Sequence, residues 1–385
     1  MNRLTTSGAG YDLARFPENP RDPFRAWDAS DEYLLRHLEG IDGAEPVGLS
    51  GRVVIVGDRW GALATVLAAH RPVQITDSYL AQRATAANLE RNGTDPDAVH
   101  LLSARETPPD RIDVLLVRVP KSLALLEDQL HRLAPAVHAG TVVIGTGMVK
   151  EIHTSTLKLF ERIIGPTRTS LAVKKARLIH CTPDPSLTRT PSPWPYHYEL
   201  PDDVGAVAGR TVVNHAGIFC AERLDIGTRF FLKHLPVRSG PDRVVDLGCG
   251  NGVLGLAAAL ADPEASLTFV DESYQALASA EATFRANAGP DAEARFVVGD
   301  GLDGAEPGGA DLVLCNPPFH SHQATTDATA RTMFHGARTA LRQGGELWVV
   351  GNRHLAYHTQ LRRIFGNCTT VAGDPKFVVL RAVKR

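Results

Sequence analysis

The sequence predicts an α/β protein of two tandem, doubly wound domains, with mostly parallel sheets and an antiparallel C-terminal strand pair. Three observations carry this prediction. Short β-branched strands alternate with helices, four motifs of the first half recur in order in the second half, and a proline-rich stretch separates the halves. Alternating strands and helices are typical of a parallel sheet with helices on both faces. A chain of 385 residues is long enough for two such domains.

Both halves begin with a β-branched run, a glycine turn and an Ala/Leu-rich helix. This succession is VVIVGDRWGALATVLAAH from Val53 and VVDLGCGNGVLGLAAALA from Val244. Three further pairs follow in the same order, at 76–79 and 270–274, 113–121 and 311–319, and 139–147 and 344–352. Four matched pairs at similar spacing predict duplication of a whole domain, not a short-period solenoid.

The boundary between the copies is predicted from proline. Six prolines from Pro183 to Pro201 exclude a helix or a central strand there. We therefore predict an N-terminal copy at 1–183, a linker at 184–209 and a C-terminal copy at 210–385. The first part of the C-terminal copy should form a β-hairpin and then a helix.

The C-terminal copy shows the alternation most clearly. Strands are expected at 243–247, 266–271, 295–298, 311–315, 345–351 and 377–383, and helices at 253–261, 274–288, 324–341 and 355–364. Only a short turn precedes the last strand, and such a turn permits only an antiparallel pair.

Composition excludes several classes of protein. Lys and Arg total 41 against 43 Asp and Glu, so the net charge of −2 argues against a polybasic surface over the whole protein. Five scattered cysteines without a C-x-x-C pair argue against a disulfide framework or zinc ribbon. The N-terminus lacks the apolar core of a signal peptide. The longest apolar run, 244–261, is interrupted by Asp246 and glycines, so we expect a cytoplasmic protein without a membrane span.

A glycine-rich turn after the first strand of the C-terminal copy predicts a cofactor site. Glycines there permit positive φ and close approach of the backbone to a ligand, and ligands of open α/β sheets bind at the carboxyl ends of strands. Asp271 and Asp300 close the next two strands, where they could accept hydrogen bonds from ribose hydroxyls and from an adenine amino group. The expected cofactor-binding residues are Asp246, Gly248, Gly250, Asn251, Gly252, Asp271 and Asp300.

The turn alone does not identify the cofactor. Its glycines also fit the dinucleotide pattern G-x-G-x-x-G, and a plain strand-to-helix turn can use glycines for packing. S-adenosylmethionine is favoured over NAD because Asp246 suits a cationic amino-acid group and would repel a pyrophosphate. A tetrapeptide after the fourth strand points the same way.

That tetrapeptide is Asn316-Pro317-Pro318-Phe319, whose four residues we expect to be catalytic. Two prolines remove two N–H donors, so the backbone offers only carbonyl acceptors, and the Asn316 amide oxygen adds another. Such acceptors can hold both hydrogens of an amine and aim its lone pair at a methyl sulfonium, while Phe319 stacks on a planar base. The plainer interpretation is a rigid loop in which Asn316 caps the strand end.

The N-terminal copy lacks most of these features. Asp246, Gly250, Asn251 and Asn316 are replaced by Ile55, Arg59, Trp60 and Arg118, respectively. Arginine and tryptophan should fill the space of the cofactor. We therefore predict a non-catalytic copy that supports the structure or contacts the substrate, and one cofactor per chain.

Basic residues gather in the N-terminal copy between Lys158 and Arg177, where Lys174, Lys175 and Arg177 are candidate RNA-binding residues. A solvated surface is the alternative. No metal site is expected, because His320 and His322 are too few as ligands and no Cys or carboxylate lies at ligand spacing.

The second half resembles the bacterial ribosomal RNA guanine-N2 methyltransferases that are built from two tandem methyltransferase-like, Rossmann-like domains. The matching stretches are NHAGIF, LDIGTRFFLKHLP, VVDLGCGNGVLG, NPPFH, MFHGARTALRQGGELWVVGNRHL and IFGNCTTVAGDPKFVVLRAVK. The resemblance is strong over 210–385 and weaker over the first half, which is similar to the inactive N-terminal copy of that family.

This resemblance implies an enzyme that uses S-adenosylmethionine to make N2-methylguanosine in ribosomal RNA. It implies that the glycine turn with Asp246 lines the cofactor, that Asp271 holds the ribose and Asp300 the adenine edge, and that the tetrapeptide from Asn316 holds the guanine. The stretches NHAGIF, RHLAYH and IFGNCTT are more similar to the large-subunit (23S) branch than to the 16S branch. The target base must be flipped or already unpaired.

Other functions remain open on the residues alone. The same clamp suits a 16S guanosine, adenine N6 in nucleic acid, or the side-chain amide of glutamine in a release factor. A binding protein without activity and an NAD dehydrogenase are further alternatives, although the former would require both copies to be inactive.

Overall fold

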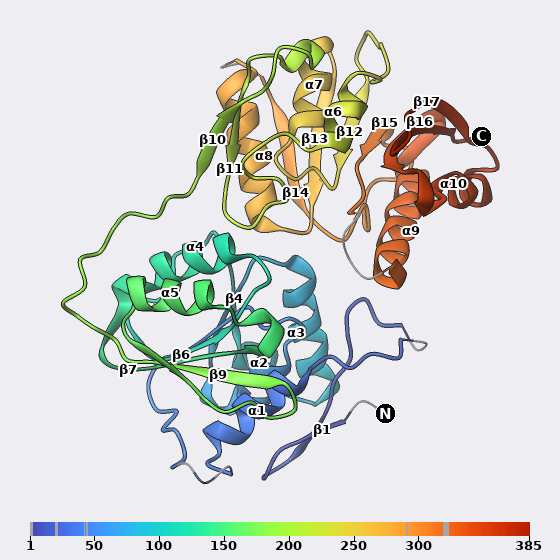
Figure 1. Cartoon of the computed structure of the whole chain (residues 1–385). Helices are drawn as coiled ribbons and strands as arrows, with labels where there is room; N and C mark the ends of the chain where they lie inside the picture. The colour runs from blue at the N-terminus through green and yellow to red at the C-terminus, as the bar shows by residue number, and fades with distance from the viewer. Residues whose placement is uncertain (1–2, 20–21, 42, 44, 290–291, 319–322) are drawn as a thin grey trace. The chain divides into compact units, whose positions relative to one another are not determined.

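The computed structural model describes the chain except residues 1–2, 20–21, 42, 44, 290–291 and 319–322. The chain divides into two compact units, Met1–Pro193 and Trp194–Arg385 (Figure 1). Each unit holds a seven-stranded sheet and a separate two-stranded sheet.

The N-terminal unit alternates strands and helices. Its elements include β1 (Arg3–Thr5), β2 (Gly10–Asp12), α1 (Ala29–Leu38), β3 (Val53–Val56), α2 (Ala62–Val66), β4 (Val73–Thr76), α3 (Tyr79–Arg91), β5 (His100–Ser103), β6 (Ile112–Arg118), α4 (Leu123–Leu133), β7 (Val137–Met148), α5 (Thr154–Ile163), β8 (Thr167–Thr169) and β9 (Ala176–Cys181). The strand order is β5-β4-β3-β6-β7-β9-β8, in which β9 is antiparallel to both β7 and β8 and the other pairs are parallel.

The C-terminal unit repeats this succession. Its elements include β10 (Tyr196–Glu199), β11 (Thr211–Asn214), α6 (Ile226–Leu232), β12 (Arg243–Leu247), α7 (Val253–Ala261), β13 (Ser266–Asp271), α8 (Tyr274–Asn287), β14 (Ala294–Val298), β15 (Ala310–Cys315), α9 (Gln323–Ala340), β16 (Leu341–Asn352), α10 (Tyr357–Phe365), β17 (Thr369–Gly373) and β18 (Phe377–Val383). The strand order is β14-β13-β12-β15-β16-β18-β17, and only the pairs formed by β18 are antiparallel.

The two sheets therefore have the same order, strand for strand. Both confirm the predicted mostly parallel topology with antiparallel C-terminal strands. In each, the chain runs outward through three strands and then returns to the other side of the first, β3 or β12. The carboxyl ends of β12 and β15 flank this switch point, which is where open α/β sheets bind ligands.

Alternate residues of the central strands face two separate cores in the C-terminal unit. Val244 and Leu312 pack with α6, α7 and α8, whereas Val245 and Val313 pack with α9 and α10. This alternation follows from the two-residue period of a strand. The N-terminal unit is layered in the same way, with α1, α2 and α3 on one face and α4 and α5 on the other.

The two-stranded sheet of each unit docks on the equivalent helix through an asparagine. Asn92, which follows α3, donates to the Asp12 carbonyl and accepts from its N–H, with both distances 2.9 Å. Asn287, the last residue of α8, makes the same pair of bonds with Thr211, at 2.7 and 3.2 Å. The small sheets therefore belong to the duplicated unit.

The predicted linker differs in extent from the observed boundary. Residues 194–209, the second part of the predicted linker, contribute β10 and the buried side chains of Leu200, Val204 and Val207 to the C-terminal unit. β10 tolerates its proline-rich surroundings because Pro195 precedes the strand and Pro201 follows it. The hairpin partner of β11 thus lies before the predicted start of the C-terminal copy.

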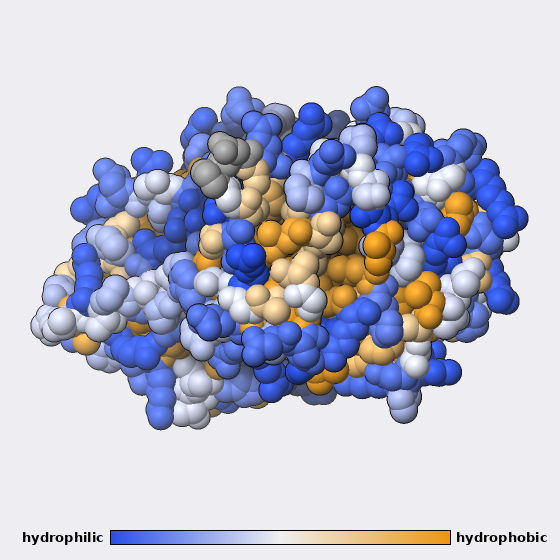
Figure 2. All heavy atoms as spheres, turned by 90° about the horizontal axis from the view of Figure 1, so that it is seen from above, coloured by the Kyte–Doolittle hydropathy of each residue, from blue (hydrophilic) through white to orange (hydrophobic). Residues whose placement is uncertain are grey.

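The surface seen from above is mostly hydrophilic, with hydrophobic residues gathered near the middle of that face (Figure 2). Exposed large apolar side chains of the C-terminal unit include Phe219, Ile226 and Val237. Within the described residues, no helix has the length and apolar character that crossing a bilayer requires.

Candidate active site

The carboxylate of Asp246 joins the end of β12 to the start of α7. It is 1% exposed, and its Oδ2 accepts a hydrogen bond of 2.8 Å from the Gly255 N–H in the first turn of the helix. Its Oδ1 is buried and has no hydrogen-bond partner among the residues that the structure describes. Burial raises the pKa of Asp246 to about 8, with a smaller contribution from the charge of Asp271, although the Gly255 bond opposes the rise. A buried acceptor without a partner predicts a ligand that donates.

The glycine turn leaves open space beside this carboxylate. Gly252 begins α7 with φ 76°, and a Cβ there would lie 2.9 Å from the Ala280 Cα, so the helix α8 approaches too closely for any side chain. At Gly250 the φ is 54°, and an added Cβ would meet nothing within 4 Å. A side chain is thus excluded at Gly252 by packing, while at Gly250 the backbone borders free space that a ligand can occupy.

Asp271 at the end of β13 holds the turn in place. Its Oδ2 accepts from the Gly250 N–H at 2.9 Å, and its Oδ1 accepts from the Ser273 N–H at 3.0 Å. Burial raises the pKa of Asp271 despite these bonds. Asp300 follows β14, and burial and the neighbouring Asp303 raise its pKa. The parallel order β14-β13-β12 brings Asp246, Asp271 and Asp300 to one edge of the sheet.

Asn214 is a residue of the candidate site that was not predicted from the sequence motifs. It ends β11, is fully buried, and accepts a hydrogen bond of 3.1 Å from Asn251 in the glycine turn. The stretch NHAGIF contains it, but its role depends on β11 reaching the turn across 37 residues of sequence. Such a contact leaves no local signal.

Asn316 lies directly after β15, one residue beyond the pair formed by Leu247 and Cys315. It is therefore at the same sheet edge as Asp246. Its Nδ2 donates to the Thr228 Oγ1 at 3.0 Å, and its Oδ1 is buried without a partner among the described residues, which leave out 319–322. Pro317 is buried and Pro318 exposed, and Phe319 lies outside the described residues.

Of the predicted cofactor and clamp residues, Asp246, Gly250 and Asn316 thus lie at the switch point between the neighbouring strands β12 and β15. Asp246 Oδ1 and Asn316 Oδ1 are buried there without a partner among the described residues, and the turn at Gly250 is open. These features fit S-adenosylmethionine, whose ammonium group can donate to a carboxylate and whose bulk needs a turn without side chains.

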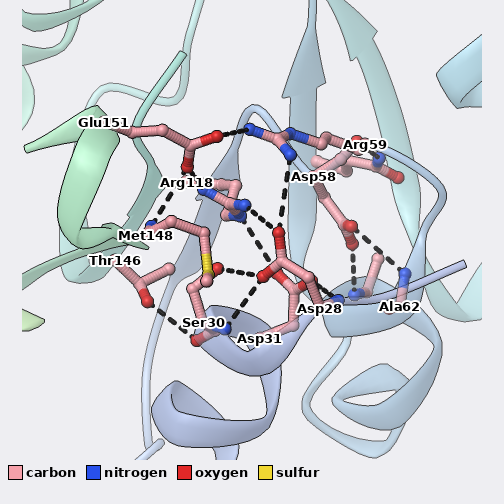
Figure 3. Close-up of polar contacts among 12 residues, drawn as sticks. Asp28, Ser30, Asp31, Asp58, Arg59, Ala62, Arg118, Thr146, Met148 and Glu151 are labelled. Atoms are coloured by element: carbon pink, nitrogen blue, oxygen red, sulfur yellow. Dashed lines mark hydrogen bonds and ion pairs between the residues drawn. The ribbon is translucent and has the colours of Figure 1, made fainter. Parts of the chain in front are cut away.

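The equivalent edge of the N-terminal unit is closed by an ion network (Figure 3). Arg118 stands where the C-terminal unit has Asn316, and its guanidinium is almost fully buried. It contacts Asp28 at 2.6 Å, Glu151 at 3.1 Å and Asp31 at 3.2 Å, and Arg59 contacts Glu151 at 2.9 Å.

The acidic residues of this network have pKa values that are shifted in opposite directions. Burial would raise the pKa of Asp28 and Glu151, but the neighbouring Arg118 and Arg59 hold both below their usual range. Burial dominates for Asp31, which lies deeper, and raises its pKa to about 7 although Arg118 opposes the rise. We predicted that Arg59 fills the space of the cofactor. Arg118 lies at the same edge of the sheet.

The helix-capping carboxylate of the N-terminal unit has also moved. Asp58 accepts from the Ala62 N–H at 3.1 Å and the Ala64 N–H at 2.9 Å, and Ala64 is the counterpart of Gly255. Its carboxylate thus replaces that of Asp246 from within the loop. Trp60 packs against the core of the α1–α3 face and beneath Arg15.

The candidate RNA-binding residues lie in the turn between β8 and β9 (Lys174 and Lys175) and in β9 itself (Arg177). Lys174 and Lys175 both adopt positive φ, 49° and 64°, in the tight turn that Val173 and Ala176 close. The Lys174 Nζ lies 3.0 Å from Glu32, which offsets its charge, whereas Lys175 is exposed. Arg177 is half-buried.

A metal site has no support from the described part of the chain, where no three His, Cys, Asp or Glu side chains are placed to hold an ion. His320 and His322 lie outside the described residues.

Comparisons with known proteins cover both halves of the chain. Family models match residues 1–185, as the RLMG N-terminal domain, and residues 209–381, as the methyltransferase small domain. Ribosomal RNA large subunit methyltransferase G of Streptomyces griseus is 80% identical over all 385 residues of both chains. The protein of that name from Aeromonas salmonicida is 48% identical over 99% of each chain.

Among solved structures, the Thermus thermophilus 16S rRNA N2 G1207 methyltransferase, in complex with AdoMet and guanosine, superposes with a TM-score of 0.74. It is 20% identical and covers 100% of this chain and 97% of its own, so it supports the two-domain fold. On the sequence matches, the chain belongs to the family of ribosomal RNA large subunit methyltransferases G.

Proposed function

We propose that the protein transfers a methyl group from S-adenosylmethionine to the exocyclic N2 amine of a guanosine in 23S ribosomal RNA, and that it acts in the cytoplasm. The observation that carries this proposal is the buried Oδ1 of Asn316, which no described residue hydrogen-bonds, at the edge shared with Asp246 and the glycine turn. Family membership supports the large-subunit substrate.

The cofactor supplies an electrophilic methyl group, so the protein needs to position the amine more than to activate it. Asn316 Oδ1 accepts one N2 hydrogen, and the carbonyl groups beside Pro317 and Pro318 are candidates for the other. Held in this way, the nitrogen directs its lone pair toward the methyl group. The N–C bond forms as the C–S bond breaks, and the amine proton leaves to solvent.

The remaining site residues hold the cofactor. Asp246 accepts from its ammonium group, Asp271 from the ribose hydroxyls and Asp300 from the adenine amino group, while Gly248, Gly250, Asn251 and Gly252 form the turn around it. Phe319 is proposed to stack on the guanine. The N-terminal copy supports the fold and offers Lys174, Lys175 and Arg177 to RNA phosphates, with Lys175 the most available of the three.

Substitution Asn316→Ala tests the clamp. We expect a fall in kcat of at least about 100-fold, the usual cost of losing a hydrogen bond made in the transition state. Binding of S-adenosylmethionine by calorimetry should stay within a few-fold. Full turnover by this variant would exclude the clamp.

The substrate is tested by offering labelled cofactor with 23S rRNA, 16S rRNA, DNA and a release factor. Label in 23S rRNA, identified as N2-methylguanosine by mass spectrometry, is expected. Label confined to 16S rRNA would move the substrate to the small subunit, N6-methyladenine would change the acceptor, and label only in the release factor would end the proposal.

A further inference from the structure

A chain of hydrogen bonds reaches the clamp amide from the start of α6. Asn316 Nδ2 donates to Thr228 Oγ1 at 3.0 Å, and Thr228 Oγ1 lies 3.2 Å from Asp225 Oδ2, to which it donates. Asp225 is the N-cap of α6 and also accepts from the Thr228 N–H at 2.8 Å. Thr228 is 88 positions from Asn316 along the chain.

The direction of these bonds fixes which end of the Asn316 amide faces the site. An ionised carboxylate only accepts hydrogen bonds, so the single hydroxyl proton of Thr228 is directed to Asp225. Thr228 Oγ1 is then left as an acceptor, and only the NH2 end of Asn316 can satisfy it. The amide oxygen must point the other way, where it is buried and has no partner in the described part of the chain.

The N-terminal copy supports the importance of this position. Asp28 and Asp31 are the N-cap and third residue of α1, as Asp225 and Thr228 are of α6. Asp31 contacts Arg118 at 3.2 Å, just as Thr228 contacts the equivalent Asn316. Both copies keep this contact. The side chain at the third helical position is complementary to its partner at the strand end: the Asp31 carboxylate faces the Arg118 guanidinium, and the Thr228 hydroxyl faces the Asn316 amide.

We infer that Thr228 is a positioning residue for the amine clamp, oriented by Asp225, which fixes the Asn316 amide with its oxygen toward the substrate. The inference rests on the proposed function for its kinetic consequences, but not for its geometry. Without the hydroxyl, the amide can rotate and present NH2 to the target amine, which repels it.

Three variants separate positioning from folding. Thr228→Val keeps the shape but removes the hydroxyl, Thr228→Ser restores it, and Asp225→Asn keeps an effective N-cap while allowing the bond direction to reverse. For Thr228→Val we expect kcat to fall about 10- to 100-fold, with KM and cofactor affinity within about twofold of the unsubstituted protein. Thr228→Ser should recover most of the loss, and Asp225→Asn should show a smaller, several-fold fall.

Side-chain amide NMR of protein labelled at asparagine nitrogen tests the geometry without activity. The Asn316 signal, assigned with the Asn316→Ala variant, should shift in Thr228→Val and Asp225→Asn and return in Thr228→Ser. If the protein showed this pattern of shifts but methylated no RNA, the hydrogen-bonded chain from Asp225 to Asn316 would be supported, and only the proposed function would be refuted.

The inference is overturned if Thr228→Val turns over at the unsubstituted rate, or if Thr228→Ser is impaired as strongly as Thr228→Val. A fall in kcat matched by an equal loss of cofactor affinity or thermal stability would also overturn it, as would an Asn316 amide signal that is the same in all variants.

Discussion

The two units build the same edge of the same sheet and fill it in opposite ways. In the C-terminal unit, Asp246 and Asn316 present buried oxygens without partners beside an open glycine turn. In the N-terminal unit, the equivalent edge carries Arg118 paired with three carboxylates. The scaffold contacts are shared, so the ability to bind a ligand is decided by which groups are left unsatisfied.

This comparison also assigns the stability of the two edges to different sources. An unpaired buried acceptor costs free energy, which the C-terminal unit tolerates at a site intended for a ligand. The network of the N-terminal unit satisfies its charges internally, and it joins α1, the end of β6 and the segment after β7. We therefore expect this edge of the sheet to be more rigid in the N-terminal unit than in the C-terminal unit.

The largest expected effect is that of removing the central charge of the network. Arg118→Ala should lower the free energy of unfolding of the N-terminal unit by about 3–5 kcal/mol, because buried carboxylates lose their partner. Denaturation of the full chain by urea measures this. Arg59→Ala, at the more exposed end of the network, is the matched control and should cost about 0–1 kcal/mol. Equal costs for the two would show that burial does not govern the network.

The next largest effect is expected from replacing Gly250 in the glycine turn of the C-terminal unit with arginine, the residue (Arg59) at the equivalent position of the N-terminal unit. Gly250→Arg should weaken binding of S-adenosylmethionine at least about 100-fold, which is about 2.7 kcal/mol. Gly289→Arg is the control, since Gly289 also has positive φ, 85°, and open space around it but lies after α8. Calorimetry on the unsubstituted chain should give one cofactor per chain, and two equivalent sites would contradict the difference between the copies.

A further prediction concerns pH. The folded-state pKa of Asp31, about 7, lies above its ordinary value of 3.8, so the native state binds this proton more strongly. Stability should therefore fall as pH rises from about 4 to about 7. Asp28 and Glu151, with lowered pKa values, lose their contribution only at more acidic pH.

Asp31→Asn should remove most of this slope, because the amide stays neutral beside Arg118, Asp28 and Asp58. Asp246→Asn should leave the pH dependence of the N-terminal unit unchanged. It should change the pH dependence of the C-terminal unit, in which burial raises the pKa of Asp246 to about 8. Thermal unfolding at pH 5.5 and 7.5 distinguishes them. An unchanged slope in Asp31→Asn would mean that another group carries the dependence.

Much of the fold could be predicted because its signals are local. Residues 243–247, 266–271, 377–383 and 253–261 were predicted with the bounds that the structure shows. The first two are strands that end next to Gly248 and at Asp271, and the helix at 253–261 lies between Gly252 and Asp262. β10 was missed because four residues between prolines carry no alternation of their own. The linker was consequently drawn too long.

The site divides in the same way. Asp246 and Asn316 were predictable because glycines and prolines around them mark their places in the chain. Asp28, Asp31 and Thr228 were not, because each acts through a partner about 90 residues away. Polar contacts at such distances depend on how α1 and α6 pack, which residue spacing does not specify.

The ion network has an evolutionary consequence. Changing Arg118 alone to asparagine, the residue at the equivalent position of the C-terminal unit, would leave Asp28 and Glu151 without the buried cation between them. That single change passes through a less stable protein. The arrangement of the N-terminal edge is therefore expected to persist, because a change at Arg118 must be accompanied by changes at its acidic partners.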